Sequence, residues 1–347
     1  MLAMPHALPH HVPIAVTDRG DHPENVHFGS IAVVDANGIL LASAGDVNYP
    51  VFTRSALKPF QVMPLMARLG HGDVLSDADI ALLCASHSGE PMHVEGVAAL
   101  LARIGADETA LACGCHTPYF YAALGQTPPP DATYSRLQHN CSGKHAGMLL
   151  LAHALGAPLS GYLDCDHPVQ AEIIRSVSHF SGIPADQLVR GIDGCGAPNF
   201  ALPLRALAQA FARLTLAGED ARYGAAPHRV ARAMVTHPEL VSGAARRDLI
   251  LMQAGRGDWV SKEGADGVRA IASFSRGIGI AAKCSDGQMA PLMVALVDAL
   301  EQLGWTDETS RVALAALLPP PIRSAAGDDV GQMRSVLTLT SPALMGT

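Results

Sequence analysis

Apolar and polar positions follow two different periods along the chain, and these periods separate predicted strands from predicted helices. Apolar runs at 31–34 and 39–42 flank a turn-forming Asn37-Gly38 pair, which predicts a β-hairpin near the N-terminus. Helical spacing then recurs through the middle of the chain. We predict helices over 55–69, 77–83, 94–104, 145–155, 169–180, 202–214, 228–236 and 290–303.

Strand-like runs return near the C-terminus, at 268–274, 279–283 and 335–339. With the N-terminal hairpin they would form an antiparallel sheet from both chain ends, with a helical block between them, in the α/β (α+β) class. We expect a single catalytic domain over 14–347, with two merged lobes as the alternative. Residues 1–13 lack the basic start and apolar core of a signal peptide, and we interpret them as a flexible N-terminal tail.

Composition narrows the range of partners. The 347 residues are 49% hydrophobic and 16% charged, which excludes a disordered chain, and the net charge of −8 leaves no basic excess for nucleic acid. No apolar run reaches the roughly 20 residues that span a bilayer, so we expect no membrane partner and a cytoplasmic location. The seven cysteines are an odd number, which favours reduced thiols or metal ligands over a disulfide framework.

A serine and a lysine lie one helical turn apart at the start of the predicted helix over 55–69. Both side chains of Ser55-Ala56-Leu57-Lys58 point to the same side, so a neutral lysine amine could take the proton of the serine hydroxyl. Because a lysine has a pKa of about 10.4, burial or a second cation must first lower the pKa of Lys58. A Ser-x-x-Lys spacing also arises by chance, and an exposed helix start is the competing interpretation.

Two further segments favour the catalytic interpretation. A polar cluster over 84–90 contains Ser86 and His87 and follows an apolar run directly, although a helix end with a glycine turn would look the same. The segment 261–267 contains a second lysine, Lys262, just before the predicted strand over 268–274. Its charge could keep Lys58 neutral, because two amines in one pocket cannot both stay charged cheaply. Acyl transfer is the reaction class that this order of groups indicates.

Two glycine-containing strings could bind substrate or metal. The string 140–147 opens an apolar helix, so its backbone amides could face a carboxylate, and Asp193 in the string 191–198 could hold a substrate ammonium group. Cysteines in both strings would suit Zn²⁺, but no Cys-x-x-Cys or spaced His pair accompanies them, so zinc is a minority interpretation from spacing alone. The cluster of Cys113, Cys115 and His116 is better explained by inert thiols.

One more segment has two interpretations. A helix-breaking proline stands in 237–243, and Arg246, Arg247 and Asp248 follow it. An ion-paired surface and a substrate lid explain this segment equally well.

Together these segments resemble the asparaginase II family, the Rhizobium etli type of L-asparaginase. The resemblance runs from about Val16 to about Arg334. The motifs that carry it, in one order along the chain, are Ser55-Ala-Leu-Lys58-Pro59, Cys84-Ala-Ser86-His87-Ser88, Asn140-Cys141-Ser-Gly-Lys144-His145, Asp193-Gly194-Cys195, His237-Pro238-Glu239 and Lys262-Glu-Gly264-Ala-Asp266-Gly. Their joint occurrence is far more specific than any one of them.

The resemblance implies a fold similar to serine β-lactamases and glutaminases, and hydrolysis of L-asparagine to L-aspartate and ammonia through an acyl-enzyme. It implies two adjacent Ser-Lys pairs, Ser55 with Lys58 and Ser86 with Lys262. We favour Ser55 as the nucleophile, because its lysine is one turn away, with Ser86 relaying protons or bonding the oxyanion. The sequence leaves the identity of the attacking serine open.

The resemblance also implies a zinc ion that supports substrate binding, substrate-binding residues around it, and a homodimer. The implied zinc ligands are Cys141, Lys144 and Cys195, and the implied substrate-binding residues are Arg54, His145 and Asp193. Lysine ligation requires a neutral amine, so such a site should lose its metal on acidification.

One position departs from the family pattern. Asp248 stands where the Rhizobium enzyme has a cysteine in the segment after His-Pro-Glu, and we expect this difference to affect substrate affinity and not the reaction class. Glutaminase activity is the nearest alternative, because one methylene is worth only about 1 to 3 kcal/mol of discrimination. A β-lactamase-like serine amidohydrolase and a non-catalytic zinc-bearing protein are more distant ones.

Overall fold

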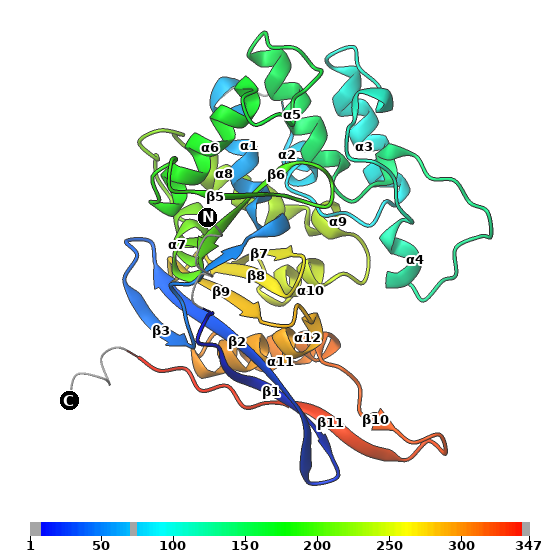
Figure 1. Cartoon of the computed structure of the whole chain (residues 1–347), viewed down its shortest axis with the longest axis vertical. Helices are drawn as coiled ribbons and strands as arrows, with labels where there is room; N and C mark the ends of the chain where they lie inside the picture. The colour runs from blue at the N-terminus through cyan, green and yellow to red at the C-terminus, as the bar shows by residue number, and fades with distance from the viewer. Residues whose placement is uncertain (1–7, 70–74, 342–347) are drawn as a thin grey trace, which may run out of the picture.

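Both ends of the chain contribute to one antiparallel sheet in the computed structural model, which describes residues 8–69 and 75–341 (Figure 1). Its strands follow the order β10-β11-β1-β2-β9-β8-β7, and β3 pairs with β2 beside this path. Every pairing is antiparallel, and the predicted hairpin is the β2–β3 pair. The strand bounds are β1 Val12–Arg19, β2 His22–Asp35, β3 Leu40–Ala44, β7 Trp259–Gly264, β8 Val268–Ser273, β9 Ile278–Cys284, β10 Ile322–Arg323 and β11 Asp329–Ser335.

The two faces of this sheet bury side chains of different size. On one face Ile31 and Ile280 pack with Leu292 of a C-terminal helix. On the other face Ala32 and Ala281 pack in the core shared with the helical block. Successive side chains of a strand point to opposite faces, so in β8 Ala270 and Ala272 face the helical block while Ile271 faces the C-terminal helix.

Helices cover both faces of the sheet. Figure 1 shows α1 to α8 gathered on one side, with α11 and α12 on the other. The helix bounds are α1 Lys58–Leu69, α2 Asp77–Leu83, α3 Pro91–Ala102, α4 Tyr119–Ala123, α5 Ser142–Ala154, α6 Pro168–Ser181, α7 Leu204–Leu214, α8 Ala226–Thr236, α9 Pro238–Ser242, α10 Arg247–Ala254, α11 Met289–Gln302 and α12 Glu308–Leu314, with short 3₁₀ turns η1 Arg54–Leu57, η2 Glu108–Ala110, η3 Arg136–Gln138 and η4 Ala315–Leu317.

A second, three-stranded sheet lies beside the helical block. Its order is β4-β6-β5, with β4 at Pro50–Phe52, β5 at Val189–Ile192 and β6 at Pro198–Pro203. Both of its pairings are antiparallel. The turn between β5 and β6 contains Asp193 and Cys195, while β4 leads directly into η1. This sheet therefore places the predicted ammonium-binding loop next to the predicted catalytic turn.

The predicted fold class is confirmed, but the bounds of some predicted elements differ in the structure. The predicted helix over 55–69 begins as the 3₁₀ turn η1, and the predicted strand over 335–339 is wrong because β11 ends at Ser335. Lys262 itself lies in a strand, β7, which comes just before β8 and pairs with it. Strand β1 begins at Val12, within the predicted N-terminal tail over 1–13, of which residues 1–7 lie outside the described part of the chain.

Within residues 8–69 and 75–341, no helix has both the length and the apolar character needed to cross a lipid bilayer.

Candidate active site

A close helix contact brings two of the predicted motifs together. Helix α5 begins against the end of α2, where a Cβ on Gly143 would lie 2.2 Å from the carbonyl oxygen of Leu82. Only glycine permits this approach. The backbone amide of His87 donates to the Asn140 carbonyl at 3.2 Å, which fixes the segment after α2 on the start of α5.

Lys58 is the centre of the site. It is the first residue of α1 and is 1% exposed. Its Nζ donates to the carbonyl oxygen of Ala85 at 2.6 Å, to Ser86 Oγ at 2.9 Å and to Cys141 Sγ at 3.2 Å. Its partners are thus two oxygens and a sulfur. No carboxylate pairs with it among the residues that the structure describes.

The environment of Lys58 favours a neutral amine. Burial lowers the pKa of Lys58 to about 8, and the charges of Lys144 and Lys262 act in the same direction, while Cys141 opposes them. A lysine with this pKa is partly deprotonated near neutral pH, so it can accept a proton from a hydroxyl group. The expectation that Lys262 helps to keep Lys58 neutral agrees with this direction, although burial is the larger cause.

Ser55 lies in η1, one turn before Lys58, and is half-buried. Its hydroxyl has no hydrogen bond within the described parts of the chain, and Lys58 contacts Ser86 instead. The preceding residue, Arg54, adopts a left-handed backbone with φ of 52°, and its amide donates to Asn199 Oδ1 at 3.2 Å. A non-glycine residue in this region is costly, and such strain is found at functional sites. The backbone therefore turns sharply at the residue before Ser55.

Two thiols and an amine lie together beside Lys58. Cys141, Lys144 and Cys195 are each 4% exposed, and Lys144 Nζ donates to Cys195 Sγ at 2.8 Å. A hydrogen bond from Cys195 and the charges of Lys58 and Lys144 lower the pKa of Cys141 well below the ordinary value, against the effect of burial. The pair can therefore hold one thiolate between two lysines.

Lys144 differs from Lys58 in its charge state. Burial disfavours its charged form, but Cys141, Cys195 and Asp193 outweigh burial and raise the pKa of Lys144. In residues 8–69 and 75–341, no group of three or more His, Cys, Asp and Glu side chains is arranged to hold a metal. The predicted ligand set contains only two residues of these types, with Lys144 as the third.

Lys262 occupies a different kind of environment in β7. Its side chain is fully buried, and its Nζ donates to Asp248 Oδ2 at 3.2 Å and to the backbone carbonyl of Glu263 at 2.9 Å. Strand β7 runs close to the start of η1, because a Cβ on Gly264 would lie 2.5 Å from the carbonyl oxygen of Thr53. The second lysine is therefore near the serine turn but is held by a carboxylate.

His145 offers an unpartnered ring nitrogen. The backbone amide of Ala112 donates to the Tyr162 hydroxyl at 2.8 Å, so the hydroxyl proton can go to His145 Nδ1, 2.7 Å away. Burial lowers the pKa of His145 well below 6.5, so the ring is neutral and Nε2 holds its proton. Nε2 is buried and has no hydrogen-bond partner in the described structure. This ring nitrogen is therefore an unused polar atom inside the helical block.

His87 has no comparable free atom. Its Nε2 lies 2.8 Å from Ser142 Oγ, its Nδ1 accepts from the Gly89 amide, and its ring stacks on His93 at 4.8 Å. The ring is completely buried, and burial lowers its pKa. His87 therefore supports the segment that contains Ser86.

Arg54 connects two acidic side chains near the serine turn. Its Nε donates to Asp193 Oδ1 at 2.9 Å, and its Nη1 contacts Asp266. Arg54 and Asn199 also line an open cavity of about 440 Å³. The three predicted substrate-binding residues thus occur in two groups, Arg54 with Asp193 and, separately, His145 with Tyr162.

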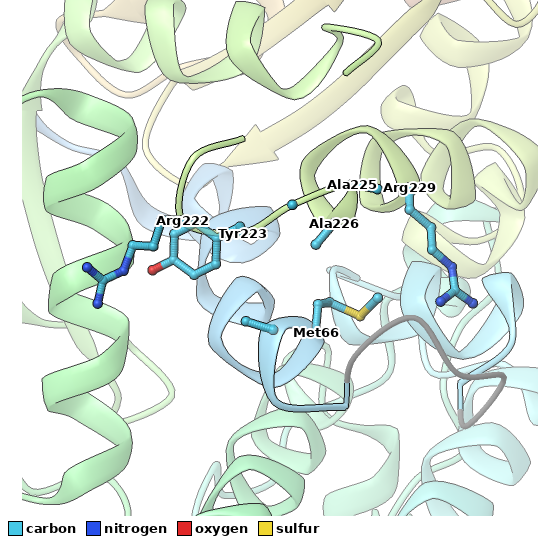
Figure 2. Close-up of a pocket in the computed structure, with 8 residues that line it drawn as sticks. Met66, Arg222, Tyr223, Ala225, Ala226 and Arg229 are labelled. Carbon is cyan, nitrogen blue, oxygen red and sulfur yellow. The ribbon is translucent and has the colours of Figure 1, made fainter. Parts of the chain in front are cut away.

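A second hollow lies elsewhere in the helical block. It has a volume of about 190 Å³ and is shown in Figure 2 between Met66 of α1 and Ala226 of α8, with Arg222 and Arg229 pointing to opposite sides. None of the predicted site residues lines this hollow.

The remaining candidates do not join the cluster. Cys113 is buried and Cys115 is exposed, while His116 Nε2 contacts Asn140. The Glu239 carbonyl in α9 contacts His93 Nε2 at 3.1 Å, which indicates a packed segment and not an open lid.

Sequence reasoning missed three residues of the site. Tyr162 and Asn199 stand in no motif, because their contacts are made across the fold. Arg269 could have been found, since it is the charged residue in the apolar predicted strand over 268–274. It is completely buried and contacts Asp248.

The family model described as L-asparaginase II matches residues 15–335. No curated protein matches the sequence.

Solved structures show weaker likenesses. Mglu in its native form has a TM-score of 0.44 and 15% identity over 80% of this chain, and this chain covers 64% of Mglu, less than two thirds of its length. EstCE1, a hydrolase with promiscuous acyltransferase activity, has a TM-score of 0.40 and 13% identity over 78% of this chain and 93% of its own. A β-lactamase from Mycobacterium bovis has a TM-score of 0.29 and 13% identity over 84% of this chain and 95% of its own.

Proposed function

Because the chain belongs to the L-asparaginase II family, a family of asparaginase-type amidohydrolases, we propose that its substrate is L-asparagine. The products would be L-aspartate and ammonia. The observation that supports this proposal most is the contact of 2.9 Å between Ser86 Oγ and Lys58 Nζ, a buried amine whose pKa is about 8. Such an amine can activate a serine for acyl transfer.

In the proposed reaction Ser55 is the nucleophile and Ser86 relays its proton to Lys58. Ser55 is half-buried and thus open to a substrate, whereas Ser86 is 5% exposed and already contacts the lysine. Ser55 Oγ would attack the side-chain carbonyl carbon, and the tetrahedral species would lose ammonia as the C–N bond breaks and Lys58 returns the proton. Water would then hydrolyse the β-aspartyl ester.

Substrate binding would use the groups around Arg54. The Asp193 carboxylate would hold the substrate ammonium group, and the Arg54 guanidinium would hold its α-carboxylate, since charge-assisted hydrogen bonds are the strong ones. The free Nε2–H of His145 would donate to a substrate oxygen. A buried, unpaired donor gains most from a new acceptor, because leaving it unpaired is costly.

Cys141, Lys144 and Cys195 would hold the implied zinc ion. Two thiols and an amine, all buried and in mutual contact, are a suitable donor set for Zn²⁺, which prefers sulfur and nitrogen ligands. The low pKa of Cys141 supplies one thiolate, and metal binding would require Lys144 to lose its proton. Bound zinc would supply a fixed positive charge that orders the loop of Asp193 and Cys195.

The proposal is tested by ammonia release from L-asparagine and, separately, L-glutamine, with zinc content measured on the same sample. We expect asparagine turnover with about one zinc per chain. Glutamine turnover alone would replace the proposed substrate, and nitrocefin turnover would favour a β-lactamase-like activity. If no amide is hydrolysed, the proposed substrate is wrong.

The serine assignment is tested by Ser55→Ala, which should reduce turnover to background while the melting temperature is unchanged. Ser88→Ala is the matched control, because Ser88 lies beside the site but its hydroxyl donates to Glu90. Full activity in Ser55→Ala together with loss in Ser86→Ala would assign the nucleophile to Ser86.

We also propose that the protein forms a homodimer and is located in the cytoplasm. Light scattering of a homodimer would give about twice the chain mass of 36.2 kDa.

A further inference from the structure

A buried carboxylate lies behind Lys262. Asp248, in the first turn of α10, is 2% exposed, and the side chains of Lys262 and Arg269 beside it are fully buried. Asp248 Oδ1 accepts from Arg269 Nη1 at 2.7 Å and from Ser261 Oγ at 2.9 Å. Its other oxygen, Oδ2, accepts from Lys262 Nζ at 3.2 Å and from the Glu263 amide at 3.0 Å.

The two oxygens of Asp248 thus have different partners. Arg269 has a second carboxylate, because its Nη2 donates to Glu263 Oε2. Lys262 has only Asp248 as a carboxylate partner in the described parts of the chain. Loss of Asp248 would therefore leave Arg269 paired but would leave Lys262 as an uncompensated buried cation, which is strongly unfavourable.

Lys262 makes two hydrogen bonds and has a third N–H group to give. An ammonium group has three donors, and those to Asp248 Oδ2 and to the Glu263 carbonyl use two of them. These two contacts fix the direction of the third donor. The strand that contains Lys262 passes close to the backbone of Thr53, two residues before Ser55.

We propose that Asp248 is a positioning residue, anchored by the Arg269 guanidinium, that holds the Lys262 ammonium group so that its third N–H serves the Ser-Lys site. This inference rests on the proposed function, in which Lys262 belongs to the catalytic group. It differs from the sequence-based expectation for position 248, because it places the effect on kcat and not on substrate affinity.

The test compares two variants of the same cluster. Asp248→Asn removes the charge at nearly constant shape, and kcat for L-asparagine should fall about 10-fold to 100-fold while KM changes less than about 3-fold. Ser261→Ala is the matched control, because it removes one hydrogen bond to Oδ1 and leaves the charge. It should lower the melting temperature and keep kcat within about twofold of the wild type. Equal kcat values in Asp248→Asn and the wild type would overturn the proposal.

A double variant separates positioning from general support of the fold. If Asp248 acts through Lys262, then Asp248→Asn should cause no further loss of kcat in a Lys262→Met background. A full additional loss there would overturn the proposal. If Asp248→Asn does not fold, Asp248→Glu keeps the charge and displaces the carboxylate, and an unchanged kcat in that variant would also overturn it.

A second substrate distinguishes failure of this inference from failure of the proposed function. p-Nitrophenyl acetate is an activated ester, and its acylation burst reports the reactive serine whatever the natural amide is. Slower acylation in Asp248→Asn than in Ser261→Ala would support the inference even if L-asparagine were not hydrolysed. Equal acylation rates would overturn the inference even if asparagine turnover were confirmed.

Discussion

Lys58 and Lys262 are both completely enclosed by protein, yet their surroundings are opposite. Lys58 contacts a carbonyl, a hydroxyl and a thiol, whereas Lys262 contacts the carboxylate of Asp248. Burial lowers the pKa of Lys58 to about 8, because its partners do not outweigh the cost of a buried charge. We infer that the partners of a buried lysine, and not burial alone, decide whether its amine can act as the proposed base or is held in an ion pair.

The lysine count makes this contrast sharper. The sequence has four lysines and twenty arginines. Lys58, Lys144 and Lys262 are buried at the site, and the fourth, Lys283, is in β9 with its Nζ bonded to backbone carbonyls. Arginine stays charged when buried, whereas lysine can lose its proton. Three of the four side-chain amines that can lose a proton thus lie at the site where we propose acid–base chemistry.

Replacement of the proposed base should have the largest effect. We expect Lys58→Met to reduce kcat about a thousandfold or more, because no other amine contacts Ser86 in the described residues. The free energy of unfolding at pH 7 should not fall and could rise by up to about 3 kcal/mol, since the charged form of Lys58 is disfavoured in the folded state. The measurements are steady-state kinetics and denaturant unfolding.

Lys283→Met is the matched control and should retain kcat within about threefold. Wild-type activity in Lys58→Met would remove Lys58 from the mechanism and with it the contrast between the two lysines.

Replacement of the fixed cation should have a smaller effect on rate and the opposite effect on stability. Lys262→Met should reduce kcat about 100-fold and lower the free energy of unfolding by about 2 kcal/mol, because Asp248 loses a charged hydrogen-bond partner while it keeps Arg269. Denaturant unfolding of this variant and of Lys58→Met should therefore shift in opposite directions. Equal shifts would show that the two environments do not differ in the proposed way.

The pH profile should follow the Lys58 amine. Since the neutral form is the base, kcat/KM should rise about tenfold per pH unit below pH 8 and level off above it. The free energy of unfolding should also rise with pH, between about 8 and the ordinary lysine pKa of 10.5, because the unfolded chain binds the Lys58 proton more tightly there. A kcat/KM that falls as the pH rises toward 8 would contradict the assignment of Lys58 as the base.

We expect the smallest effect on rate at the proposed zinc site, where Cys195 contacts Lys144, the third buried lysine. Cys195→Ala should lose zinc and raise KM for L-asparagine about 10-fold with little change in kcat. Metal analysis and kinetics of the same sample measure both quantities. If the variant keeps metal and affinity, the zinc assignment is wrong.

Local features of this molecule could be predicted from the sequence, and long-range pairings could not. The Asn37-Gly38 hairpin and the Ser55–Lys58 spacing are each encoded within a few residues. The structure contains the hairpin as β2 and β3, and it places Ser55 one turn before Lys58. The Asp248 contacts join residues 14 and 21 positions away, on β7 and β8. No periodicity reveals such pairings, because they depend on which strands lie side by side.

The same limit explains the errors at the site. Ser86 was expected to pair with Lys262, but in the structure it contacts Lys58, since α2 ends against the start of α1 and α5. The strand predicted over 335–339 is wrong because β11 already ends at Ser335. The apolar residues Leu337 and Leu339 pack in the core beyond the end of this strand. The hydrophobic pattern predicted most helices and strands, but the packing of these elements determines which site residues contact one another.

The most direct test of the account is a titration of the Lys58 amine by NMR in protein labelled with ¹³C at the lysine ε carbons. Four lysines give a spectrum that single substitutions can assign, and Lys58→Met identifies the decisive signal. We predict that this signal titrates with a midpoint of about 8. A midpoint at the ordinary lysine value of about 10.4 would contradict the account, because Lys58 would then be a charged residue like any other and not the base.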